Sequence, residues 1–583
     1  MKIALFLLLS FLLPAPSRPV ASLRFQEPTK HQDDSFGPIT FWDGEYLVAE
    51  VRGTSGTYDQ VSKMGAVKGG RVSYHTKPRG ADDKSRKVML EFPSGDIDGK
   101  RNRFLLPEGG VAFMDDGTRI EAQQLEVDYA LQRLTSSKPV RLTKPGMLLT
   151  GSGLEADDTI RQLVIPRDGF LEILGQPRDL VPDRPARVPA PTLVTRLLSK
   201  GPLTIRDIGG PERLFLVSAT GGATFERSEN GERTRATADS LVVYFTRRNE
   251  AMAPVSATGR GAITVVDSRG TRATASSLDW EYREDVVHLR DVDFTAKGQR
   301  VKAKRADMDR WNGVATFTGD LSADVAPAEN QPPLHIVADV LEVAVETVAK
   351  VTAASSVVAR GSVHIEGDFG PEGQRQHLVA TGAEFAWDSF AERGRLAGAP
   401  FARITQGRNV ILAPLLIFEG SSRLVLKGPK RVNISHVAPP PLWLRARNRI
   451  FGLAPESGGR SVDVALVTDA DIQFDNDARL VSVLGRCDAT TPEFSLSADR
   501  LFLHLSKDGS GLEDAKAFGD VRASAAAQGA KLSGDVLTYL PDTGVVEVVG
   551  APRALATIGE VEVTAPYLRF DQRSGSVTLG RHR

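Results

Sequence analysis

One short pattern recurs along this chain: a small residue, two positions, an apolar residue, one position and a second apolar residue. The two apolar positions have the period of a β-strand, so both would point to the same face of a sheet. Neighbouring copies mostly lie about 28 to 44 residues apart, which is typical of a stacked repeat architecture. The copies begin at Ala122, Gly151, Ala238, Ala275, Ala303, Ala338, Gly382, Ala413, Ala498, Gly534 and Ala565.

The copy at Gly534 shows what one repeat predicts. Leu537 and Tyr539 share one face of a strand, and the stretch from Pro541 to Gly544 has the composition of a tight turn. The following valines alternate again, as in a returning strand. Helical periodicity is nearly absent elsewhere, so we expect an all-β protein.

Composition and cysteine content exclude several classes. Lys plus Arg and Asp plus Glu number 73 each, so no overall field favours nucleic acid or an anionic surface. The hydrophobic share of 41% is enough for a continuous core and is below that of a membrane protein. Cys487 is the only cysteine, so an internal disulfide is excluded.

The N-terminus predicts export. Lys2 precedes an apolar run that ends at Leu13, which suits a signal peptide and is shorter than the ~20 residues that span a bilayer. We expect a signal peptide at residues 1–22, with cleavage after Ser22. Cleavage after Ser17 and an uncleaved membrane anchor are the alternatives.

Composition shifts suggest how the rest of the chain is divided. Prolines concentrated between 176 and 213, and again near 440, predict breaks because proline donates no ladder hydrogen bond. The predicted segments are an N-terminal tether with the first strands (23–100), a β module (101–175), a Pro-rich linker (176–213), β-repeat modules (214–434), a Pro/Gly linker (435–461) and a C-terminal β module (462–583).

No pattern for catalysis or metal binding is present in the sequence. None of the nine histidines forms an HExxH or similar close pair, and no Gly-x-Ser-x-Gly elbow occurs. Paired carboxylates such as Asp115 and Asp116 lie beside turn signals, where capping is their ordinary role. We therefore expect no enzyme activity, cofactor or metal.

The repeats resemble the OstA-like module of lipopolysaccharide-transport proteins. The segments that carry this resemblance are Ala517–Val521, Ala530–Tyr539 and Val549–Gly550, and the "Ala-Asp-x-Leu" strand entries at Ala236–Leu241 and Leu496–Leu501. Residues 101–175 are similar to the LptC-type relative through Gly117–Ala122, Ser137–Val140 and Gly151–Ala156. The chain is identified as a multi-module member of the LptA–LptC-type periplasmic family.

The resemblance implies tandem half-open β-jellyroll ("β-taco") modules, stacked as a β-repeat array around a hydrophobic slot. It implies a periplasmic bridge or shuttle that carries lipopolysaccharide or a related glycolipid toward the outer membrane. Other β-jellyroll envelope proteins would bind by edge-strand pairing, and no nucleic acid is expected. The residues expected to line the slot are Leu125, Val127, Leu241, Val243, Leu278, Trp280, Leu341, Val343, Phe385, Trp387, Leu416, Phe418, Leu501, Leu503, Leu537, Tyr539, Leu568 and Phe570.

Two other functions fit the same repeats. One is a cell-envelope scaffold whose apolar residues fill a dry core. The other is a β-helical carbohydrate-binding protein or adhesin, since solenoids repeat at similar lengths. The sequence leaves open the lipid, the transport component that the chain would replace, the oligomeric state, and whether the interior is a closed core or an open slot.

Overall fold

The computed structural model describes the chain from Phe36 to Gly580. It leaves out residues 44–45, 76–86, 158–160, 176–192, 210–213, 230–231, 249–250, 269–270, 282–283, 297–298, 310–311, 326–333, 349–350, 370–375, 389, 407–408, 420–422, 439–459, 476, 491–493, 506–511, 526–528, 542 and 572–575. The expected signal peptide therefore lies outside the described residues. The described part contains strands and turns and no helix, which confirms the all-β prediction.

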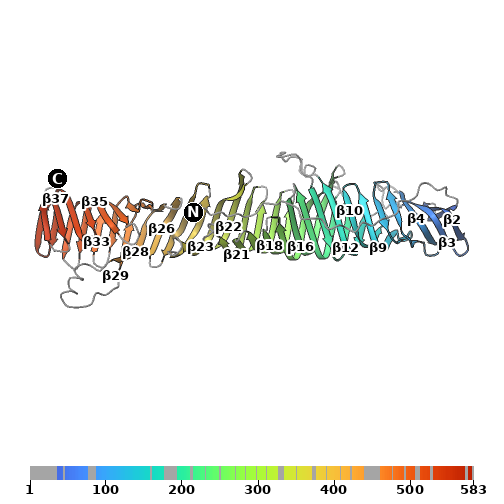
Figure 1. Ribbon diagram of the computed structural model, residues 1–583, viewed down its shortest axis with the longest axis horizontal. Coiled ribbons are helices and arrows are strands. Elements are labelled where there is room, and N and C mark those ends of the chain that lie inside the picture. Colours follow the sequence, from blue (N-terminus) through green and yellow to red (C-terminus); the bar gives the residue numbers. More distant parts are fainter. Residues whose placement is uncertain are drawn as a thin grey trace. The chain divides into compact units, whose positions relative to one another are not determined.

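The chain divides into two compact units. Figure 1 labels strands of both. The N-terminal unit comprises the described residues up to Lys297 together with Ala303–Ala315, and the C-terminal unit comprises Gly298–Lys302 and the residues from Thr316 onward. β20 (Gln299–Asp309) and β21 (Val314–Val325) lie where the two units divide.

The N-terminal unit contains β1 to β19. Their bounds are β1 Phe36–Asp43, β2 Tyr46–Asp59, β3 Met64–His75, β4 Lys87–Asp98, β5 Arg103–Leu106, β6 Gly110–Met114, β7 Arg119–Ala122, β8 Leu125–Asp128, β9 Arg133–Lys144, β10 Met147–Asp157, β11 Gln162–Ile165, β12 Arg167–Gly175, β13 Leu193–Ser199, β14 Leu203–Gly209, β15 Leu214–Glu229, β16 Glu232–Arg248, β17 Ala251–Asp267, β18 Arg272–Glu281 and β19 Val286–Ala296.

The C-terminal unit contains β22 to β39. Their bounds are β22 Leu334–Val348, β23 Val351–Phe369, β24 Gln376–Asp388, β25 Arg393–Gln406, β26 Asn409–Glu419, β27 Arg423–Lys427, β28 Lys430–Ala438, β29 Arg460–Thr468, β30 Ile472–Asp475, β31 Leu480–Val483, β32 Cys487–Thr490, β33 Phe494–Ala498, β34 Arg500–Leu505, β35 Leu512–Ala525, β36 Ala530–Leu540, β37 Val545–Ile558, β38 Val561–Asp571 and β39 Ser576–Gly580.

Each unit is a sheet folded into two layers. Long strands pair along their two halves with two different short strands: β4 with β6 and β5, β15 with β13 and β14, β26 with β28 and β27, and β35 with β33 and β34. We name the layers within each unit. In the N-terminal unit, layer A contains β6, β7, β12 and β13, and layer B contains β5, β8, β11 and β14. In the C-terminal unit, layer A contains β28, β29, β32 and β33, and layer B contains β27, β30, β31 and β34. The long strands contribute one half to each layer.

The strands turn from one layer to the other at corners that interrupt the pairing. In β17 the corner lies at Gly261, whose φ of 91° favours glycine. Asp239 of β16 stabilises this corner by accepting the N–H of Ala262 at 3.2 Å. Asp339 and Gly361 repeat the arrangement in β22 and β23, where the carboxylate accepts the N–H of the residue after the glycine at 3.1 Å. The aspartate of the "Ala-Asp-x-Leu" motif thus fixes the point at which the neighbouring strand bends.

The predicted linkers are partly wrong. β13 and β14 lie inside 176–213, and β12 and β15 pair with them, so the sheet continues across this segment. Pro202 lies at the corner between β13 and β14, where its carbonyl accepts the N–H of Thr220. Proline lacks a backbone N–H, and at this corner no ladder hydrogen bond requires one. In the second predicted linker, 435–461, β28 and β29 pair on both sides of 439–459, which lies outside the described residues.

The β-helical alternative is also wrong. All pairings given between the described strands are antiparallel, mostly between sequence neighbours joined as hairpins. A β-helix instead stacks parallel strands from successive coils.

Candidate functional site: the apolar interior

The N-terminal unit carries an unbroken row of apolar residues and glycine across layer B. Directly paired positions on consecutive strands form this row, so each member is the register partner of the next. We call it the N row. Its members are Tyr58, Gly65, Ile97, Phe104, Val127, Leu134, Ala156, Leu163, Ile205, Val217, Val243, Ala257, Trp280 and Val287. All of them are buried or half-buried.

The C-terminal unit repeats this feature in both layers. In layer B the C row contains Leu341, Ala359, Phe385, Leu396, Leu416, Leu426, Ile472, Val483, Leu501, Ala517, Leu537, Val548, Leu568 and Leu579. In layer A a second row contains Ile336, Ile365, Ala380, Ile404, Ile411, Val432, Leu466, Ala489, Leu496, Ala523, Leu532, Ala556 and Val563. Leu579, on the last strand, is the exposed member.

The structure places the predicted lining residues on these inner faces. None of the eighteen is exposed. The buried ones are Leu125, Val127, Leu241, Val243, Trp280, Leu341, Val343, Trp387, Leu416, Leu501, Leu537 and Leu568. The half-buried ones are Leu278, Phe385, Phe418, Leu503, Tyr539 and Phe570.

The exposure within these pairs differs between copies. In the four copies that contain Phe418, Leu503, Tyr539 and Phe570, the second residue, which lies nearer the hairpin turns, is more exposed than the first. In the copies at Leu278 and Phe385 the order is reversed, and the second residue, Trp280 or Trp387, is the buried one. On the other parity Glu281 is exposed, while Asp279 and Thr538 are half-buried. Whether the inner residues contact a lipid stays a prediction.

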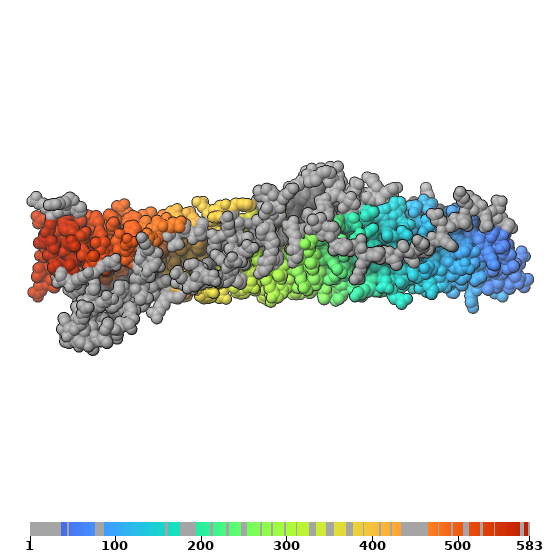
Figure 2. Space-filling view, in the orientation of Figure 1, coloured from blue at the N-terminus to red at the C-terminus, as the bar shows by residue number. Residues whose placement is uncertain are grey.

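The interior of the N-terminal unit is closed by aromatic contacts between the layers. Phe41 of layer A lies 5.2 Å from Tyr129, which follows β8 of layer B. Phe225 of layer A lies edge-on to Trp280 of layer B at 6.4 Å. Where grey atoms do not cover this unit, Figure 2 shows its coloured side chains packed against one another on the face in view. These side chains cover the edge of the interior opposite the corners.

Two small cavities lie behind this edge. One, of about 20 Å³, is lined by Phe41, Tyr74, Phe104 and Tyr129 with neighbouring aliphatic residues. The Tyr129 hydroxyl is buried without a hydrogen-bond partner, and burial raises its pKa. The other cavity, of about 50 Å³, is lined by Leu142, Lys144, Met147, Asp207 and Phe215 among others. Both volumes suit a few water molecules rather than an acyl chain.

A charged contact fixes the edge of the larger cavity. The Lys144 ammonium donates to Asp116 at 2.5 Å, and the Thr118 N–H donates to the same carboxylate at 3.0 Å. Burial alone would raise the pKa of Asp116, but these two donors outweigh it and hold the pKa at about 2. The contact joins the turn after β6 to the end of β9.

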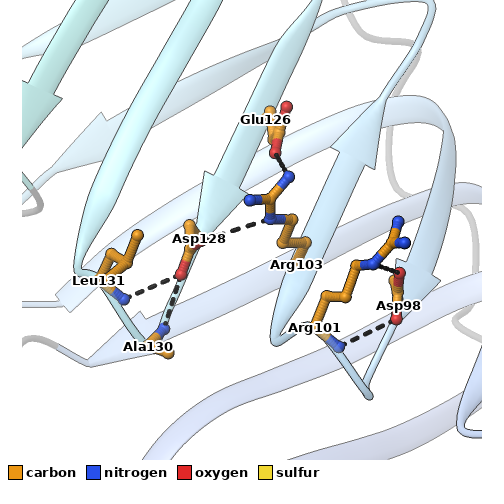
Figure 3. Close-up of polar contacts among 7 residues, drawn as sticks. All are labelled: Asp98, Arg101, Arg103, Glu126, Asp128, Ala130 and Leu131. Carbon is orange, nitrogen blue, oxygen red and sulfur yellow. Dashed lines mark hydrogen bonds and ion pairs between the residues drawn. The ribbon is translucent and has the colours of Figure 1, made fainter.

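Ion pairs lie on the outer face and turn edge of layer B (Figure 3). Arg103 contacts Glu126 at 3.0 Å and Asp128 at 3.4 Å. Asp128 also accepts the backbone N–H groups of Ala130 and Leu131 at 3.1 and 2.8 Å. These exposed pairs contribute little stability individually. The outer face is therefore charged where the inner face is apolar.

The sequence reasoning missed the role of this turn aspartate. Asp98, Asp309, Asp388 and Asp475 also cap the turns that follow their strands. Asp128, Asp309, Asp388 and Asp475 each follow directly after an apolar-x-apolar pair, so the sequence contained the signal in the position after the second apolar residue of the repeat.

Within the described part of the chain, no group of three or more His, Cys, Asp and Glu side chains could hold a metal ion. The described residues include no helix long and apolar enough to cross a membrane. Cys487 is buried, and burial raises the pKa of its thiol to about 11.

Comparisons with known proteins find similarities among solved structures. No protein-family model and no curated protein matches the chain. Among solved structures, the chain is similar to LptH, the LptA-homologous periplasmic component of the lipopolysaccharide transport device from Pseudomonas aeruginosa. The match has 17% sequence identity and a TM-score of 0.17, and it covers 21% of this chain and 75% of LptH. A similarity of this extent assigns neither a family nor a function.

Proposed function

We propose that this protein binds lipopolysaccharide or a related glycolipid between layers A and B and carries it through the periplasm toward the outer membrane. It acts as a bridge or shuttle and not as an enzyme. The sequence resemblance to the OstA-like and LptA–LptC-type family motivates the choice of ligand and compartment.

The observation that carries the proposal is the continuity of the apolar rows. The core of a short domain needs only a local cluster of apolar residues. The N row and the C row instead continue from strand to strand through their units. An acyl chain laid along such a row would meet apolar side chains at every strand. Burying it is worth ~0.8 kcal/mol per methylene, or roughly 10 kcal/mol for twelve carbons.

Binding requires the layers to separate. The corners join the layers through the backbone, and the opposite edge of the N-terminal unit is covered by side-chain contacts such as Phe225 with Trp280. Rotation of these side chains would admit an acyl chain while the sheet ladders stay intact. The lipid would then replace contacts that the two layers make with each other.

β39 supplies a site for a partner. In the described part of the chain it pairs with β38 along one edge, and Leu579 on it is exposed. An open strand edge pairs readily with another strand. We expect a second copy, or another β-jellyroll envelope protein, to extend the C-terminal unit there.

A dry-core scaffold is the second candidate. The tight packing of the interior favours it, since Leu396, Leu416, Leu426 and Ile472 are each at most 1% exposed.

Purification of the exported protein without detergent, followed by lipid mass spectrometry, separates the two candidates. The transport proposal predicts acyl lipid in near-stoichiometric amount, displaced by added lipopolysaccharide. A folded protein that carries no lipid, and takes up none when lipopolysaccharide is supplied, would contradict the transport proposal and favour the dry-core scaffold.

A further inference from the structure

A guanidinium group lies on the inner face of the N-terminal unit. Along the layer A half of β15, Ala223, Phe225 and Arg227 alternate inward, and all three are buried. The outward residue between the last two is Glu226, which contacts Arg235 at 3.8 Å on the outer face. Arg227 therefore occupies an inward position, next to the edge opposite the corners.

Arg227 reaches the other layer. Its guanidinium carbon lies 5.5 Å from the centre of the Trp280 ring, which belongs to the N row of layer B. Phe225 meets the same ring edge-on. The cation thus stands at the entrance of the interior, with apolar residues behind it. A guanidinium is weakly hydrated and stacks on aromatic faces, which explains how it is accommodated there.

Threonines are the register partners of Arg227 on both neighbouring strands. Thr195 of β13 is the register partner of Arg227 on one side and is buried, and Thr234 of β16 is its partner on the other side. Asp267 follows in the same row, and its carboxylate accepts the N–H of Thr271 at 2.8 Å. The planar fork of a guanidinium, with threonine hydroxyls as additional donors, suits the oxygens of a phosphate group.

We propose that Arg227, with Thr195 and Thr234, binds the anionic phosphate head of an amphipathic lipid whose chains lie deeper along the N row. This rests on the proposed lipid-binding function and adds the ligand class and the residue that recognises it. A purely apolar ligand would gain nothing from the cation, whereas a phosphate at the entrance would gain charge-assisted hydrogen bonds. Binding of the phosphate head would replace the contact between the Arg227 guanidinium and the Trp280 ring. The guanidinium would then move away from the ring and open the entrance.

The test compares two amphiphiles of equal chain length, dodecyl phosphate and dodecyl maltoside, on the full chain. Wild-type protein should bind the phosphate more tightly, and Arg227→Gln should weaken phosphate binding at least tenfold while maltoside binding changes less than twofold. Arg227→Lys keeps the charge and loses the two parallel N–H donors of the guanidinium. Its affinity for dodecyl phosphate should lie between those of the wild type and Arg227→Gln. Arg235→Gln, on the outer face of the next strand, is the matched control and should change neither affinity.

The outcomes separate this inference from the proposed function. If the wild type binds neither amphiphile, the lipid-binding function itself fails. If it binds both and Arg227→Gln weakens both equally, or neither, the lipid function stands and the phosphate site is overturned. Inorganic phosphate alone should compete only weakly; competition as strong as that of dodecyl phosphate would assign a free-phosphate site and contradict the lipid head. Should Arg227→Gln fail to fold, the preference for dodecyl phosphate over dodecyl maltoside is compared between the wild type and Arg227→Lys. A weaker preference in Arg227→Lys supports the phosphate site, and an equal preference contradicts it.

Discussion

Gly361 approaches Asp339 so closely that a Cβ on the glycine would fall less than 3.0 Å from the carboxylate. The two residues lie on adjacent strands at the corner where β23 passes from one layer to the other. The φ of Gly361 is 96°, a conformation that L side chains rarely adopt. Two separate effects therefore favour glycine at position 361: the positive φ would strain any other residue, and an added Cβ would collide with Asp339.

A double-mutant cycle separates these two reasons. Gly361→Ala should destabilise the C-terminal unit by at least about 2 kcal/mol, and the cost should fall by about 1 kcal/mol in an Asp339→Gly background, which removes the Cβ of residue 339 as well as its carboxylate. Gly559→Ala is the control, because its φ is 60° with no atom within 4 Å of the added Cβ, so strain acts alone. Hydrogen exchange of β22 and β23 measures the effect. Strict additivity of the two changes would contradict the steric contact.

Trp387 should be important for its ring and not for its N–H group. Its indole Nε1 is buried without a hydrogen-bond partner, and the ring covers Gly394 on the paired strand. Trp387→Ala should cost about 3 to 5 kcal/mol, whereas Trp387→Phe should cost within about 1.5 kcal/mol because it also removes an unsatisfied donor. Exchange rates in β24 and β25 give both values. Equal costs for the two variants would show that the N–H group is used.

The contact between Lys144 and Asp116 predicts a loss of stability in acid. The pKa of Asp116 is lowered from 3.8 to about 2, so its contribution is complete above pH 4 and disappears as the pH falls through 2. The contribution is at most about 2 kcal/mol and smaller after solvent screening. The wild type should lose hydrogen-exchange protection near the turn after β6 as the pH falls from 4 to 2, and Asp116→Asn should lose less over the same range. An equal loss of protection in the two proteins would mean that groups other than Asp116 cause it.

The all-β fold and the parity of the lining residues could be predicted because both depend on local period. Leu537 and Tyr539 share a strand face whatever the tertiary structure. The layers could not be predicted in the same way, because the corner at Gly361 depends on Asp339 in a neighbouring strand. The repeat contained this signal as an aspartate after the small residue, without showing what it contacts.

The prolines misled the prediction for a physical reason. Pro202 predicts a break because it cannot donate to a ladder, yet it lies at a corner, where the ladder is interrupted in any case. The inward cation Arg227 was missed because alternation marks polar residues as outward. Only the register of β15 with β13 and its contact with Trp280 place it inside.

The most direct measurement of the central claim is photo-cross-linking from inside and outside the folded sheet. A photoreactive phenylalanine at Phe385 replaces an aromatic side chain of similar shape on the C row, and one at Thr538 lies on the opposite parity. In protein exposed to lipopolysaccharide, the lipid-transport account predicts a glycolipid adduct from position 385 and none from position 538. Adducts of equal yield from both positions, or none from either in folded protein, would contradict it.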